Sequence, residues 1–263
     1  KWIHKFIGDK AFYKMVLTVA VPIMIQNGIT NFVGLLDNIM VGRVGTVQMS
    51  GVAIVNQLMM VFNLAIFGAI SGAGIFGAQF FGCKDHKGVQ HTFRFKIYIC
   101  ALILLLGIVI LAGWGEELIL LYLHGEGGDV TALEDTLFYG QLYLLIMLFG
   151  LPPFCVDQVY TSTLRECGET MLPMKSGIAA VLVNLVLNTI LIFGFLGFPA
   201  MGVAGAALAT VISRYVQAAI TVIWTHMHGK QMMFIKGVYR SFKIPGNLVK
   251  KIAINGTPLM INE

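Results

Sequence analysis

Charged residues are scarce in this sequence. Asp, Glu, Lys and Arg make up only 12% of its 263 residues, whereas 57% of the residues are hydrophobic. A typical soluble domain carries about 25% charged residues. The shortage of charge excludes a disordered chain, which needs high charge and low hydrophobicity. It also excludes an ordinary soluble enzyme, whose surface needs more polar side chains, so the composition predicts an integral membrane protein.

Motifs that carry chemistry are also missing. The sequence contains no P-loop, no HExxH and no GxSxG motif, and its four cysteines form no CxxC pair. We therefore expect no enzymatic activity, no zinc or redox site and no cofactor other than a coupling ion. The net charge of +5 resides mainly between apolar segments, so we expect no nucleic-acid partner.

Six long apolar segments dominate the chain, and a helix needs about 20 such residues to cross the hydrocarbon core of a bilayer. The segments are continuous rather than alternating, which disfavours transmembrane strands. The expected spans are Val16–Met40, Val52–Gln79, Ile97–Trp114, Leu137–Tyr160, Ser176–Phe195 and Val203–Trp224. The stretch Glu116–His124 either forms a short interfacial helix or extends the third span. We therefore predict an all-α integral membrane protein with a six-helix transmembrane bundle.

Positive charge is divided unevenly between the two ends of the expected spans. All of the 18 lysines and arginines except Arg43 and Arg214 lie in the N-terminal segment or in the segments after the second, fourth and sixth spans. Because Lys and Arg are enriched in cytoplasmic loops, we predict a multi-pass protein of the cell membrane with a cytoplasmic N-terminus. This orientation disfavours a seven-helix receptor, whose N-terminus would lie outside.

The end of the sequence is similar to its beginning. Segment 14–27, KMVLTVAVPIMIQN, aligns without gaps with segment 250–263, KKIAINGTPLMINE. The matching positions are either a coincidence between apolar segments or the sign of a six-helix unit followed by the start of a second unit in the same orientation. In the second case, residues 1–226 form an N-terminal six-helix lobe, 227–247 a cytoplasmic inter-lobe linker, and 248–263 the truncated start of the second lobe.

Two aspartates fall within the expected spans, where a carboxylate costs at least about 2.5–3.5 kcal/mol on insertion scales. Asp37 is either an interhelical hydrogen-bond partner or, as we favour, an ion or proton site. Asn184 and Asn188 share one helix face, and Thr210 lies in the last span. Together with Asp37, these side chains either only join helices or form a sodium-binding cage of oxygen atoms. Asp157, near the cytoplasmic interface, is either an ion or proton site or, as we favour, a structural hydrogen-bond partner that water or a nearby arginine could satisfy.

Several segments, in this order, resemble the multidrug and toxic compound extrusion (MATE) family of cation-coupled efflux transporters. They are VPIMIQNGITNFVGLLDNIMVGRVG, GAQFFGCKDHKGVQHTFRF, LRECGETMLPM, and NLVLNTILIFG followed by MGVAGAALAT. The resemblance implies a twelve-helix transporter with two lobes, of which this chain is the N-terminal one. It further implies the export of drugs or other cationic or amphipathic small molecules across the cytoplasmic membrane, in exchange for sodium or protons, by alternating access.

The resemblance also implies roles for single residues. It makes Asp37 the essential acid of the first helix, in a coupling-ion site completed by Asn184, Asn188 and Thr210. If the ion is sodium, the metal ligands are Asp37, Asn184 and Asn188. Several family members have Asp where this chain has Asn188, so the site here carries one charge fewer. Glu263 aligns with the region of a functional acid in the seventh helix, and with Asp157 it is a candidate for the transport pathway.

A lipid-linked oligosaccharide flippase of the same superfamily is the alternative function. Such a protein usually needs a more cationic cavity for a pyrophosphate headgroup, and Arg214 is the one base deep within an expected span. The expected partners are therefore a small-molecule substrate, the lipid bilayer and a C-terminal lobe of the same chain.

Overall fold

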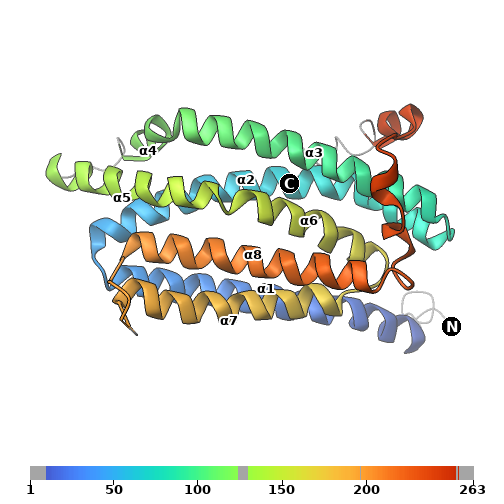
Figure 1. The fold of residues 1–263 in the computed structure, drawn as a ribbon, viewed down its shortest axis with the longest axis horizontal. Helices are drawn as coiled ribbons and strands as arrows, with labels where there is room; N and C mark the ends of the chain where they lie inside the picture. The colour runs from blue at the N-terminus through green and yellow to red at the C-terminus, as the bar shows by residue number, and fades with distance from the viewer. Residues whose placement is uncertain (1–9, 124–129, 196, 253, 255–263) are drawn as a thin grey trace, which may run out of the picture.

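The computed structural model describes residues 10–123, 130–195, 197–252 and 254, and this part of the chain is helical and contains no strand. The long helices lie side by side in an elongated bundle (Figure 1). They are α1 (Lys10–Gly42), α2 (Thr46–Gly82), α3 (His86–Gly113), α4 (Gly115–Leu123), α5 (Val130–Leu148), α6 (Leu151–Glu166), α7 (Met171–Phe193) and α8 (Val203–Met227), followed by the short 3-10 helices η2 (Met233–Ile235) and η3 (Val238–Arg240). By length and apolar composition, five of the described helices can cross a membrane, and α5 and α6 meet the same criterion together as a bent pair, which counted as one span makes six. The predicted all-α, six-span bundle is confirmed.

The fourth predicted span, Leu137–Tyr160, is wrong as one continuous helix. It is broken between α5 and α6, whose axes differ by 50°. Pro152 and Pro153 follow the break, at the start of α6. Proline has no N–H to donate to the preceding turn, but it is well tolerated in the first turn of a helix. The two prolines therefore start a new helix instead of continuing α5.

The third span also differs from its prediction. It begins at His86 rather than at Ile97, so Arg94 and Lys96 belong to the helix and not to a loop. Lys96 is fully buried and Arg94 is 6% exposed. Both side chains have partners inside the protein, which makes their burial tolerable. Beyond this helix, the stretch Glu116–His124 forms a separate helix, α4, up to Leu123, rather than an extension of α3.

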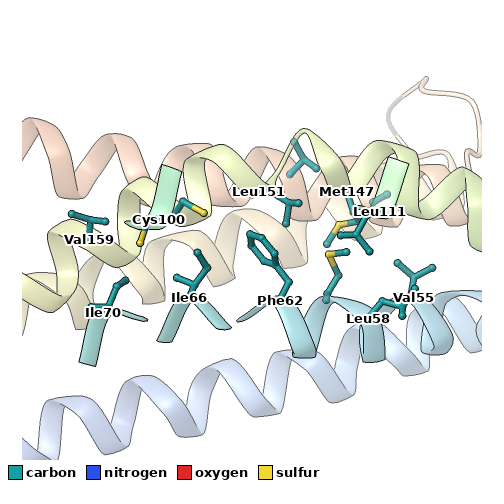
Figure 2. Close-up of a cluster of buried hydrophobic side chains, with 14 of the residues drawn as sticks. Val55, Leu58, Phe62, Ile66, Ile70, Cys100, Leu111, Met147, Leu151 and Val159 are labelled. Atoms are coloured by element: carbon teal, nitrogen blue, oxygen red, sulfur yellow. The ribbon is translucent and has the colours of Figure 1, made fainter. Parts of the chain in front are cut away.

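The hydrophobic core lies along α2, where apolar side chains recur every three or four residues and so face the neighbouring helices from one side. Figure 2 shows Val55, Leu58, Phe62, Ile66 and Ile70 of α2 with Cys100 and Leu111 of α3, Met147 of α5, and Leu151 and Val159 of α6. These helices therefore share one hydrophobic core.

The outer surface of the bundle is strongly apolar. On α3, for example, Leu102, Leu105 and Val109 are each more than half exposed. A continuous apolar surface of this kind would be a liability in water. In a bilayer it faces acyl chains of the same polarity, which agrees with a membrane protein.

Close approach of α7 and α8 depends on small residues. Gly205, Ala206, Ala207 and Ala209 of α8 are all buried. A Cβ atom added at Gly205 would lie 2.6 Å from the backbone oxygen of Leu191 on α7. Small residues at such a crossing allow two helix backbones to approach closely.

We expect Gly205→Ala to destabilise the protein by about 1–3 kcal/mol, because the added methyl group meets backbone atoms that cannot rotate away. Gly28→Ala on α1 is the matched control, since nothing lies within 4 Å of the added Cβ there. Unfolding of the detergent-solubilised variants measures both effects. Equal stability of the two variants would show that the α7–α8 contact tolerates a side chain at this position.

The segment after α8 is docked on α3. The Gln90 side chain donates to the carbonyl oxygen of Lys236 (2.8 Å), and the Arg94 guanidinium donates to that of Val238 (2.8 Å). The side chains of Phe234, Ile235 and Val238 are buried. Most of the predicted linker, 227–247, therefore has a fixed place at one end of the bundle.

Candidate functional site

A continuous chain of hydrogen bonds joins Asp37 on α1 to α7 and α8. Nδ2 of Asn188 donates to Oδ1 of Asp37 (2.5 Å) and to Oδ1 of Asn184 (3.1 Å). Nδ2 of Asn184 in turn donates to Oγ1 of Thr210 (3.2 Å), whose hydroxyl donates to the Ala206 carbonyl (3.1 Å). The structure thus brings together the four residues that the sequence analysis grouped as an ion site.

Helix geometry explains how these residues meet. Asn184 and Asn188 are four residues apart on α7 and so lie one above the other on the same face. That face is buried, with Asn184 5% and Asn188 1% exposed, and α1 and α8 both pack against α7. Asp37 is therefore presented to the pair of amides from one side and Thr210 from the other.

One atom of this network has no hydrogen-bond partner. Oδ1 of Asn188 is buried and accepts no hydrogen bond. Leaving a buried polar atom unsatisfied costs about 1–3 kcal/mol. If the amide turned this oxygen towards Asp37, a cation there would satisfy it, and hard cations prefer oxygen ligands. A single carboxylate with neutral amide and hydroxyl oxygens matches the charge of a monovalent ion.

Two cavities border the network. The first, of about 530 Å³, lies between α1, α2, α5 and α8, and the second, of about 740 Å³, lies between α1, α2, α6, α7 and α8. Asn31, Gly34, Asp37, Thr210 and Arg214 line both cavities. Both volumes fall within the range of about 300–1,000 Å³ that small-molecule sites occupy. Asp37 is therefore within reach of a ligand in either cavity.

Asp157 lies on α6 and is 3% exposed. Its carboxylate accepts hydrogen bonds from Gln217 (2.8 Å) and Thr221 (2.8 Å) of α8 and from Thr161 (3.5 Å) of its own helix. The arginine that was a possible partner, Arg165, donates instead to Oε1 of Gln26 on α1 (2.7 Å). Asp157 thus joins α6 to α8 on the wall of the second cavity. The other pathway candidate, Glu263, lies outside the described residues.

The sequence analysis missed the buried ion pair between Lys96 of α3 and Glu166 of α6. Lys96 also donates to the hydroxyl oxygens of Ser162 (2.8 Å) and Thr163 (3.2 Å). A signal for this pair was available. Lys96 directly precedes the third expected span and Glu166 lies six residues after the end of the fourth, so opposite charges lie at the same side of the expected bundle.

The fold and this network together define a membrane-embedded helical bundle with a carboxylate on the wall of its cavities, an arrangement found in transporters. The family model named MatE matches residues 22–190, and the chain belongs to this family. The resemblance found in the sequence is therefore confirmed.

Curated relatives agree with this assignment. The probable multidrug resistance protein NorM of Thermotoga maritima is 30% identical over 209 residues, which are 79% of this chain and 43% of that protein. The protein of the same name from Bacillus licheniformis is 28% identical over 97% of this chain and 54% of its own length. The chain thus spans about half the length of the curated relatives it matches.

Solved structures show the same fold. A multidrug resistance MATE family transporter of the MOP superfamily, in its outward-facing conformation, has a TM-score of 0.80 at 20% identity, over 94% of this chain and 52% of that chain. A MATE structure in the bent conformation has a TM-score of 0.78 at 22% identity, over 95% and 52%. The bundle therefore corresponds to about half of each of these structures.

Proposed function

We propose that this chain is the N-terminal lobe of a cation-coupled antiporter that exports amphipathic or cationic small molecules across the cell membrane. The observation that carries the proposal is the position of Asp37. Its carboxylate lies in a membrane-spanning helix, lines two cavities and binds Asn188, whose own oxygen lacks a partner. Carboxylates inside membrane spans are rare and mark ion or substrate pathways. The names of the curated relatives, probable multidrug resistance proteins, support export as the direction, and they lend no support to the flippase alternative.

The Asn188 amide is the part of the site that responds to the state of Asp37. The amide presents its N–H group to Asp37, an arrangement that suits an ionised carboxylate with no ion bound. A sodium ion or a proton on Asp37 removes the need for this donor and favours an acceptor, so the amide turns its oxygen inward. The contact between α1 and α7 thereby depends on ion binding. Because a ligand shifts a conformational equilibrium only through its different affinity for the two states, such a contact can couple the ion to alternating access.

A second lobe belongs to this proposal. The chain covers 52% of the solved transporter structures it resembles, and the even number of spans returns the chain to its starting side. Residues 1–226 then form the first lobe, 227–247 the linker and 248–263 the beginning of the second lobe. Lysine and arginine gather at the ends of the spans where the chain starts and where the linker lies, which supports a cytoplasmic place for both.

Transport measurements test this function directly. In vesicles that contain the full-length protein, we expect an imposed sodium or proton gradient to drive a fluorescent organic cation against its own gradient. Imposing each ion gradient separately identifies the coupling ion, and ionophores that dissipate the gradient should stop the movement. Vesicles without protein are the control. Dye movement that does not respond to either gradient would contradict cation-coupled antiport.

A further inference from the structure

Arg214 is a positive charge in the middle of a membrane-spanning helix, and no carboxylate of the described residues forms an ion pair with it. It lies near the centre of α8 and lines both cavities. Its guanidinium makes a long hydrogen bond from Nη1 to the carbonyl oxygen of Gly150 (3.4 Å), and its Cζ lies 5.1 Å from the centroid of the Phe154 ring. Within the described part of the chain, the ion pair is formed by Lys96 and Glu166 and does not include Arg214.

These contacts do not account for the charge. A guanidinium has five N–H donors and no acceptor, and an arginine at membrane depth is costly unless it is paired or faces a cavity. The Gly150 carbonyl also accepts from the backbone N–H of Phe154 (3.4 Å), so Arg214 is not needed to satisfy it. The remaining N–H groups of Arg214 are available to the cavities that it lines.

Arg94 is an arginine of the same protein whose contacts are structural, and it serves as a comparison for Arg214. It is 6% exposed, and it donates to the carbonyl oxygens of Val238 (2.8 Å) and Lys243 (3.4 Å) at the docked end of the bundle. It lines neither of the two large cavities. Arg214 differs from it in having one weak protein acceptor and a place on two cavity walls.

We propose that Arg214 binds the carboxylate group of an amphipathic substrate. A guanidinium forms two parallel hydrogen bonds with a carboxylate, and the amides of Asn31, Asn38 and Asn56 line the first cavity beside it. Asp37, of opposite charge, lines the same two cavities. The lobe therefore suits compounds that carry an acid group next to a cationic one. This inference rests on the proposed function and specifies its substrate class.

A matched pair of dyes tests the proposal on the purified full-length protein. Rhodamine 110 has a free carboxylate, whereas rhodamine 123 is the methyl ester of the same chromophore. Binding of each dye is followed by fluorescence polarisation in the absence of an ion gradient. We expect Arg214→Gln to weaken binding of the free acid by at least about tenfold while the ester stays within about twofold, because only the acid loses a charge-assisted hydrogen bond. Arg214→Lys keeps the charge but not the two parallel N–H donors of the guanidinium. We therefore expect a smaller loss of affinity for the free acid, with the ester again little affected.

The control is Arg94→Gln, which we expect to change the affinity ratio of the two dyes by no more than about twofold, because Arg94 binds backbone carbonyls and a neighbouring histidine away from both cavities. If Arg214→Gln does not fold, Arg214→Lys supplies the test. Equal loss of both dyes, or no saturable binding of the free acid to the wild-type protein, would overturn the proposal. Because binding is measured without a gradient, selective loss of the acid stands even if gradient-driven efflux fails, and the two proposals are separable.

Discussion

Ion-driven efflux by the full-length protein is expected to fall to the level of empty vesicles when Asp37 is replaced by Asn. The substitution preserves shape and leaves a side-chain oxygen for the Asn188 N–H group, but it removes the charge that would bind a sodium ion or a proton. Folding should be little affected, because the interhelical hydrogen bond can persist at a cost of about 1 kcal/mol. Efflux under imposed sodium and proton gradients, with protein amounts matched, is the measurement.

A matched control shows whether removal of any carboxylate, and not only that of Asp37, reduces efflux. Asp135 on α5 is exposed and lies away from both cavities, so Asp135→Asn should transport like the wild type.

Asn188→Asp, which adds a carboxylate where Asp37→Asn removes one, should shift the choice of coupling ion towards sodium. It places two like charges together in a dry site, where a sodium ion between them relieves the repulsion. Undiminished gradient-driven efflux by the Asp37→Asn protein would refute the ion-site proposal and leave Asp37 a structural role.

Replacement of Lys96 by Met is expected to cost about 3–5 kcal/mol of stability, because it leaves the largely buried Glu166 carboxylate without a counter-charge. The Lys96 side chain is fully buried and that of Glu166 is 11% exposed. Ser162 donates to the same carboxylate oxygen that Lys96 binds (2.8 Å), but a hydroxyl cannot balance a charge. Chemical unfolding of the solubilised protein measures the loss.

A double-mutant cycle tests whether loss of the ion pair causes the loss of stability in Lys96→Met. In Lys96→Met combined with Glu166→Gln, no charge remains buried, so much of the lost stability should return and the two single effects should not add. Lys87→Met is the control, since Lys87 lies on the same helix but is exposed. Strict additivity of the single substitutions, or a Lys96→Met protein as stable as the control, would contradict a paired role.

The sequence by itself determined the class of protein and the places of its apolar helices, because an uninterrupted apolar run of some 20 residues has few alternatives to a membrane helix. It also singled out Asp37, since a carboxylate within such a run is costly and therefore conspicuous. Asn184 and Asn188 could be placed on one face from helix periodicity alone. These conclusions need only local information, namely composition, length and the spacing of residues within one helix.

Only the tertiary structure decided which of these residues meet. The hydrogen bond between Asp37 and Asn188 joins residues 151 positions apart, and helix periodicity carries no information about how two helices are rotated against each other. The same holds for Lys96, whose burial depends on a partner 70 positions away. It holds also for Arg214, because only the packed helices show that no carboxylate in the described ranges pairs with it. The bend between α5 and α6 could be predicted only in part from the sequence. Pro152 and Pro153 indicate that the helix is interrupted there. Whether proline kinks a helix or ends it, however, depends on how neighbouring helices support the interrupted backbone.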